Sequence, residues 1–321
     1  MPVTDPFAEG IARGWKTHDG SRLEKDITLD ADIAIVGSGA GGATSAEFLS
    51  AAGYKVLLIE EGPLRSSQDF DMQEPAAYAS LYQEAIGRTS KDGAITILQG
   101  RAVGGSTLVN WTSSFRTPAA TLEHWAHEHA VENLSEQSMA PWFERMEQRL
   151  GIEPWPLPPN ANNQVIRDGC AALGYSWAVI PRNVRGCWNL GYCGMGCPTN
   201  AKQSMLVTAI PATLDAGGEL LYLARADRLM VDKGRVTALE CLAMDARSVA
   251  PTGRKIRVRA RHYILAGGGI NTPAILLRSD APDPHQRVGK RTFLHLVNFS
   301  AAQFEKVINP FYGAPQSIYS D

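Results

Sequence analysis

The sequence predicts an α/β fold in which a parallel sheet is combined with a smaller antiparallel sheet. An apolar run at 33–36 is followed by a glycine cluster, a helical pattern and a second apolar run at 56–59, the order of a βαβ unit. Residues 220–259 alternate in short segments separated by Asp, Lys and Gly turns, as antiparallel strands do. A late apolar run enters a further glycine turn and helix.

The elements of the first half follow from local patterns. Residues 1–30 are mostly polar and charged, and we expect them to form a surface arm. Apolar runs predict strands, and apolar side chains at helical spacing predict helices. In chain order these are strand Ile33–Val36, helix Ala43–Ala52, strand Val56–Ile59, a helix early in 75–93, a strand at Ile95–Leu98 and helices within 119–151.

The second half begins with a linker rich in proline and asparagine at 155–163. After it we expect a helix at 164–173, an irregular loop at 185–200 and a helix at 204–216. Antiparallel strands are expected at Leu220–Leu223, Leu229–Val231, Arg235–Ala243 and Arg254–Arg259. A buried strand at Tyr263–Ala266 leads into a helix that contains Pro273, and turns and strands alternate from Pro282 onward.

The first glycine cluster, Gly37-Ser38-Gly39-Ala40-Gly41-Gly42, matches G-x-G-x-x-G between a strand and a helix. In this pattern the first glycine permits the tight turn and the second lets backbone N–H groups approach a pyrophosphate. The third lets helix and strand pack closely. Glu60 ends the second strand, where a carboxylate accepts hydrogen bonds from ribose hydroxyls. No basic residue stands at 60 or 61 to receive a 2′-phosphate, which disfavours NADP. The unit therefore predicts a Rossmann-like dinucleotide site.

Two later segments distinguish FAD from NAD. Residues 100–110, Gly-Arg-Ala-Val-Gly-Gly-Ser-Thr-Leu-Val-Asn, form a second glycine turn. Residues 263–279 contain Ala266-Gly267-Gly268-Gly269 before a helix. These segments resemble the two signatures of the glucose–methanol–choline (GMC) oxidoreductases, a family of FAD enzymes. With the first glycine motif, the resemblance extends from Asp32 to about Gly289 in the family's order.

The resemblance implies a role for each matching position. Gly37, Gly39 and Gly42 would hold the FAD pyrophosphate, and Glu60 the adenosine ribose. Gly104, Gly105 and Asn110 would lie along the pyrophosphate–flavin half. The Ala226 backbone would meet adenine, and Ala266 and Gly267 would lie against the cofactor in the returning strand. Most of these contacts are made by the backbone, which explains the small residues.

Several positions depart from the family's pattern. Ser114 replaces the usual aromatic of the first signature. Gly269 and Asp280 differ from the second signature. Val109 stands where some members carry a histidine that binds flavin covalently, so FAD is expected to be noncovalent.

The catalytic histidine of the family lies in a C-terminal segment that these residues do not include. The seven histidines are His18, His124, His127, His129, His262, His285 and His295, and none matches that motif. We therefore name no catalytic residue.

A cysteine loop offers a separate possibility. Cys187, Cys193 and Cys197 lie among glycines, and three thiolates in such a loop can bind zinc or an iron–sulfur centre. Their spacing matches neither C-x2-C-x2-C nor paired C-x2-C motifs. We therefore expect reduced, metal-free thiols beside the flavin pocket and keep an electron-transfer subunit with an iron–sulfur centre as an alternative.

Composition excludes several classes of partner. The formal net charge is −2, from 31 basic and 33 acidic side chains, so a nucleic-acid partner is not expected. No run of about 20 apolar residues predicts a membrane span. The opening residues lack a signal peptide, and five cysteines are an odd number, which predicts a cytoplasmic protein without a disulfide framework.

Together these inferences predict an N-terminal arm (1–30), an FAD-binding domain (31–280) with a helical and Cys-rich insertion at about 119–205, and the start of an antiparallel substrate domain (281–321). The expected function is oxidation of the CH–OH group of an alcohol by hydride transfer to flavin N5. The electron acceptor is left open. The alternative to an enzyme is a truncated, noncatalytic flavin-binding fragment.

Overall fold

The computed structural model describes residues 3–295 and 297–321 and divides them into two compact units. The first unit holds the residues up to Val109, Gly194–Asn200 and Ser204–Ala301. The second holds Asn110–Cys193, Ala201–Gln203 and Ala302–Asp321. Much of the insertion predicted at about 119–205 lies in the second unit. The functions predicted for the domains stay predictions.

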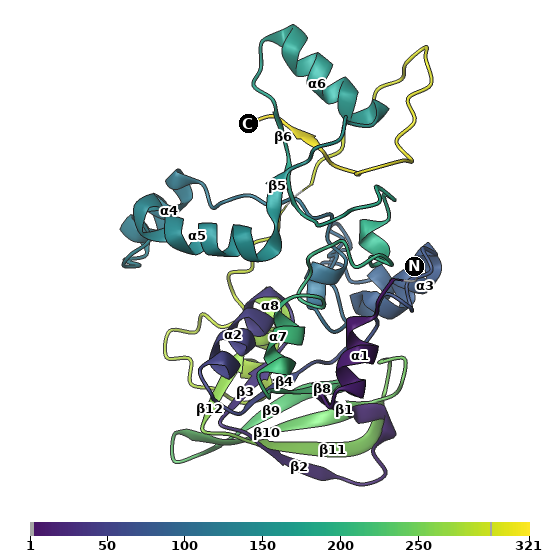
Figure 1. Cartoon of the computed structure of the whole chain (residues 1–321). Coiled ribbons are helices and arrows are strands. Elements are labelled where there is room, and N and C mark those ends of the chain that lie inside the picture. Colours follow the sequence, from purple (N-terminus) through teal and green to yellow (C-terminus); the bar gives the residue numbers. More distant parts are fainter. Residues whose placement is uncertain (1–2, 296) are drawn as a thin grey trace. The chain divides into compact units, whose positions relative to one another are not determined.

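The first unit is built on a five-stranded parallel sheet (Figure 1). Its strand order is β1 (Lys16–Asp19), β8 (Glu219–Tyr222), β4 (Val56–Ile59), β3 (Ile33–Val36) and β12 (His262–Leu265). The central strands β3 and β4 are buried along their whole length because both faces of the sheet are covered. The predicted Rossmann-like α/β fold is therefore confirmed.

Helices cover one face of this sheet and a second sheet covers the other. Helices α2 (Ala40–Ala51) and α7 (Ala209–Asp215) pack together against β3, β4 and β8 (Figure 1). The second sheet has the order β2 (Ile27–Asp30), β11 (Pro251–Arg259), β10 (Arg235–Met244) and β9 (Ala224–Asp232). Strands β9 to β11 are antiparallel, as predicted, and β2 joins β11 in parallel.

The core between the two sheets follows the two-residue period of the strands. Ala34 and Val36 of β3 and Leu57 and Ile59 of β4 share one cluster with buried residues of β9, β10, β11 and helix α8 (Gly268–Arg278). The first unit also contains the helices α1 (Pro6–Ala12) and α3 (Glu74–Leu81).

The second unit combines three α-helices with two small antiparallel sheets among its described residues. Its helices are α4 (Ala119–Glu128), α5 (Glu136–Leu150) and α6 (Ala161–Leu173). Its strand pairs are β5 (Ile152–Pro154) with β7 (Pro181–Asn183), and β6 (Ala178–Val179) with β13 (Ile318–Tyr319). The predicted helices within 119–151 and at 164–173 are confirmed, with boundaries shifted by a few residues.

Four local predictions were wrong. Residues 3–30 form α1, β1 and β2 rather than a surface arm, because Phe7 is buried and both strands join sheets. The segment predicted as Leu220–Leu223 is strand β8, which pairs in parallel with β1 and β4 rather than antiparallel. Ile95–Leu98 is not a strand, since a single bridge joins Thr96 to Thr89. Beyond Pro282, the described residues form only one strand, β13.

Candidate functional site

A cavity of about 590 Å³ in the first unit lies where the glycine segments meet. It is bordered by the ends of β3 and β4, the N-terminus of α2, the second glycine turn, the start of β9 and helix α8. Of the predicted site residues, those in its lining are Gly37, Gly39, Glu60, Gly105, Ala226, Ala266 and Gly267. A second cavity, of about 790 Å³ in the second unit, contains none of them.

The first glycine turn is shaped by backbone contacts. Gly37 has a φ of +99°, which only glycine adopts without strain, and its N–H donates to the Ile59 carbonyl at 2.8 Å. A Cβ on Gly42 would overlap the Gly37 carbonyl oxygen and would lie 3.3 Å from the Ala266 Cβ. Gly42 therefore serves helix–strand packing rather than the cavity wall.

The N-terminus of α2 is open to a ligand. Gly39 is its N-cap residue, and within the described part of the chain no side chain caps the helix there. A Cβ on Gly39 would meet only the Gly105 Cα, at 4.0 Å. Uncapped N–H groups at the positive end of a helix favour an anion such as a pyrophosphate.

The second glycine turn contacts the first directly. Gly104 and Gly105 have φ values of +101° and +55°, and a Cβ on Gly105 would lie 2.8 Å from the Gly39 Cα. The Gly104 N–H donates to Ser38 Oγ at 3.0 Å. Gly104 is therefore buried behind the cavity wall and fixes one turn against the other.

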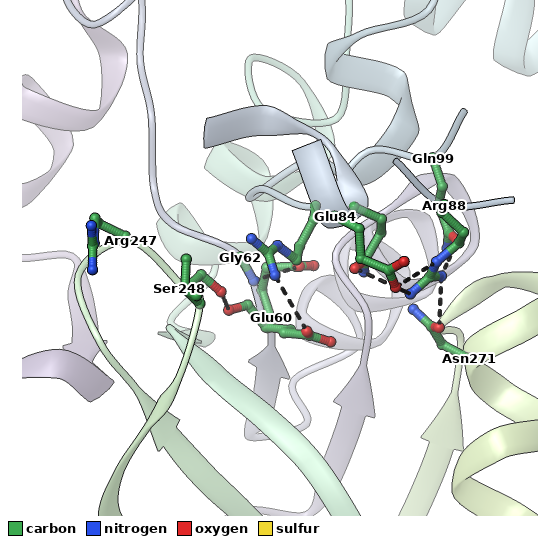
Figure 2. A network of polar contacts seen from close by, with 12 residues as sticks. Glu60, Gly62, Glu84, Arg88, Gln99, Arg247, Ser248 and Asn271 are labelled. Carbon is green, nitrogen blue, oxygen red and sulfur yellow. Dashed lines mark hydrogen bonds and ion pairs between the residues drawn. The ribbon is translucent and has the colours of Figure 1, made fainter. Parts of the chain in front are cut away.

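Glu60 is held by three donors from its own unit. Its Oε2 accepts from the Ser38 N–H at 3.0 Å and from Ser38 Oγ at 2.6 Å, and its Oε1 accepts from the Gly62 N–H at 2.9 Å. Figure 2 shows the contact with Gly62. Burial raises the pKa of the Glu60 carboxyl, and the hydrogen bonds from Ser38 and Gly62 partly oppose that rise. Oε1 keeps room for one further donor, such as a ribose hydroxyl.

Arg88 joins three segments of the cavity wall (Figure 2). Its guanidinium donates to Glu84 Oε1 at 2.9 Å, to Gln99 Oε1 at 2.9 Å and to Asn271 Oδ1 at 3.3 Å. Residues 84–86 have φ values of 52°, 50° and 65°, a left-handed turn without glycine. These contacts stabilise a backbone conformation that is unfavourable for such residues. Nothing in the sequence pattern pointed to Arg88.

Asn110 does not lie in this cavity. It belongs to the second unit, is exposed, and its carbonyl accepts from Lys202 Nζ at 2.7 Å. The predicted role of Asn110 toward the flavin half therefore stays a prediction. Val109, the residue before it, is buried.

The histidines and cysteines lie elsewhere. None of the seven histidines lines the cavity, and neither does any cysteine. Among the described residues, none of the five cysteines forms a disulfide. Within the described ranges, no group of three or more His, Cys, Asp or Glu side chains could hold a metal, so the structure does not bring Cys187, Cys193 and Cys197 together as a ligand set.

The cavity fits a dinucleotide. Two glycine turns leave backbone exposed, an uncapped helix N-terminus faces the cavity, and a buried carboxylate stands at the end of the neighbouring strand. This is the donor and acceptor set that a dinucleotide's pyrophosphate and adenosine ribose require.

Comparisons with known proteins agree with this geometry. The family profile described as GMC oxidoreductase matches residues 78–297, and one described as an NAD(P)-binding Rossmann-like domain matches residues 35–64. An uncharacterized GMC-type oxidoreductase, y4nJ of Sinorhizobium fredii, is 32% identical over 298 residues, which are 90% of this chain and 56% of the relative. The long-chain-alcohol oxidase FAO4B of Arabidopsis thaliana is 30% identical over 287 residues, covering 88% and 38%.

Solved structures share the fold. Pyridoxine 4-oxidase from Mesorbium loti superposes with a TM-score of 0.56 at 20% identity, covering 78% of this chain and 52% of that one. A formate oxidase gives a TM-score of 0.56 at 15% identity, covering 80% and 48%.

The chain spans about half the length, or less, of these relatives. The family profile covers well over half of the chain, across both later glycine segments, and the cavity has the geometry that those segments predict. The chain therefore belongs to the GMC oxidoreductase family.

Proposed function

We propose that the first unit binds FAD noncovalently and forms the cofactor-binding part of an oxidoreductase that acts on the CH–OH group of alcohols. The observation that carries the proposal is the uncapped N-terminus of α2, set between two glycine turns in mutual contact, with Glu60 at the end of β4. Family membership supports FAD over NAD. The long-chain-alcohol oxidase among the relatives supports an alcohol as substrate.

Each wall of the cavity has a part in this proposal. The α2 N-terminus and the turns at Gly39 and Gly105 would receive the pyrophosphate, and Glu60 Oε1 would accept from the adenosine ribose. The backbone of β9 at Ala226 would border adenine. The flavin, when bound, supplies the hydride acceptor of the reaction. Val109 has no atom that can bond to it, which supports noncovalent binding.

Flavin binding tests the proposal directly. The purified chain, incubated with FAD and passed through a desalting column, is expected to retain about one flavin per chain. Acid precipitation should then release the flavin into the supernatant. A chain that retains no FAD would refute the proposed cofactor, and flavin left in the pellet would refute noncovalent attachment.

A noncatalytic flavin-binding fragment is the second candidate. It is favoured by the cavity lining, which includes no histidine among the described residues. Flavin binding without alcohol-dependent reduction would support this candidate. The proposed cytoplasmic location stays a prediction.

A further inference from the structure

Strand β9 carries a bulge where it borders the cavity. Across β10, Arg228 pairs with Glu240 and Ala226 pairs with Cys241, so two steps along β9 match one step along β10. Asp227 is therefore the extra residue of a β-bulge, which interrupts the regular ladder and turns the backbone locally. Ala224, Arg225 and Ala226, just before the bulge, line the cavity.

The C-terminal end of helix α8 holds this bulge in place. The Arg278 guanidinium donates through Nη2 to the Ala226 carbonyl at 3.1 Å and through Nε to the Asp227 carbonyl at 3.0 Å. The next residue, Ser279, accepts from the Leu229 N–H through its Oγ at 2.9 Å. The adjacent side chains of Arg278 and Ser279 thus make hydrogen bonds to backbone groups of β9 between residues 226 and 229.

The bulge follows the part of β9 that lies beside Glu60 in the cavity wall. The Ala224 N–H donates to the Glu60 carbonyl at 2.9 Å, so β9 begins beside the residue proposed to hold the ribose. A pyrophosphate at the α2 N-terminus and a ribose at Glu60 would leave the base against the start of β9 and α8. Beside Arg225 and Arg278, the wall there includes the small or apolar side chains Ala224, Ala226, Ala274 and Ile275, which suit a planar ring.

We propose that Arg278 is a positioning residue for adenine recognition. By donating hydrogen bonds to the Ala226 and Asp227 carbonyls, it holds the Ala226 backbone in the orientation in which its carbonyl can accept a hydrogen bond from the edge of the base. This inference rests on the proposed binding of FAD. The Ala226 carbonyl has two lone pairs, and Arg278 occupies one of them. The other remains for a donor on the ligand, and the 6-amino group of adenine is such a donor.

The test compares ADP with inosine diphosphate (IDP), which carries an oxygen in place of the 6-amino group. Dissociation constants for both, and for FAD, are measured on the wild-type chain and on Arg278→Ala, Arg278→Lys and Arg228→Ala. Arg228 is exposed on the same strand and serves as the matched control. Thermal unfolding of each ligand-free variant accompanies the titrations.

We expect the wild-type chain to bind FAD and to prefer ADP over IDP by about tenfold, the effect of one hydrogen bond. Arg278→Ala should lose that preference, because its affinity for ADP should fall while its affinity for IDP stays nearly unchanged. Arg278→Lys, which has a single ammonium for two carbonyls, should retain part of it. Arg228→Ala should behave as wild type.

If Arg278 had a merely structural role, Arg278→Ala would weaken the binding of ADP and of IDP equally and leave the ratio of their dissociation constants unchanged. That result would overturn the inference. A wild-type chain that binds FAD but does not distinguish ADP from IDP would overturn it as well. If Arg278→Ala fails to fold, an unchanged ratio in Arg278→Lys is decisive against it. A wild-type chain that binds neither FAD nor ADP would refute the proposed function instead.

Discussion

Ser38 and Glu60 tie three separate segments together at the scale of single residues. The Ser38 hydroxyl donates to Glu60 and accepts from Gly104, and the Glu60 carboxylate also accepts from Gly62. The first glycine turn, the end of β4 and the second glycine turn therefore share one hydrogen-bonded network. A change at Glu60 is expected to affect both turns as well as the ribose.

Glu60 should give FAD binding a pH dependence. Its pKa is raised above the ordinary value of 4.5 by burial, so the fold favours the protonated carboxyl. The stability that Glu60 contributes to the ligand-free chain is thus present at low pH and is lost as pH rises through the raised pKa. Ribose hydroxyls donate to the ionised form, so FAD affinity should increase over the same interval.

Flavin fluorescence titrations between pH 4.5 and 8 measure this effect. Glu60→Gln should abolish the pH dependence and weaken FAD by about 1–3 kcal/mol, because the Gln amide turns one donor toward Ser38 or Gly62. Equal pH profiles for wild type and variant would show that another group titrates.

Helix α2 lies close to β3 because of one glycine, and this can be tested at the scale of elements. Gly42→Ala would push a methyl group into the Gly37 carbonyl, whereas Gly41 has open space around its Cα. We expect Gly42→Ala to lower the free energy of unfolding by about 1–3 kcal/mol. Gly41→Ala should raise the free energy of unfolding by about 0.5–1 kcal/mol, because Gly41 lies within the helix, where alanine is more favourable than glycine. Urea unfolding of the ligand-free variants measures both, and equal effects would contradict the packing argument.

At the scale of elements, the sequence predicted correctly those strands whose signal lies within a few neighbouring residues. Strands β3 and β4 were predicted with their observed boundaries, because each is a run of four buried apolar residues between turn signals, a pattern typical of a buried strand. Strand β8 was placed in the wrong sheet because the direction of pairing depends on β1 and β4, which lie far away in the chain. No short-range pattern encodes that choice.

The residues of the candidate site likewise divide into those with a local signal in the sequence and those that depend on distant partners. Gly37, Gly39 and Glu60 belong to one βαβ unit and were predicted from it. Arg88 and Arg278 act through partners more than 50 residues away, at Asn271 and Ala226, and no spacing rule could reveal them. Ser38 stood inside the motif, but its contact with Gly104 needed the fold.

At the scale of the whole molecule, the 321-residue chain is expected to bind FAD yet to react slowly with alcohols. None of the histidines that the structure describes lines the cavity, and general acid–base assistance contributes about 10²–10⁴-fold to such reactions. Anaerobic mixing with alcohols of several chain lengths should leave the flavin absorbance unchanged over minutes. Photoreduction of the same sample is the control that shows the flavin to be reducible. Rapid bleaching by an alcohol would show that the chain supplies its own base.

The described part of the chain contains no helix that is long and apolar enough to cross a bilayer.

The position of β3 has a consequence for folding. It lies between β4, which follows it closely, and β12, whose residue Leu265 pairs with Val36. Pairings of such long sequence separation form slowly, because the intervening chain must first be ordered. We therefore expect the cavity wall at Ala266 and Gly267 to be completed late in folding, when β12 pairs with β3. FAD should therefore recognise the folded unit and no earlier species, leaving the refolding rate unchanged while slowing unfolding.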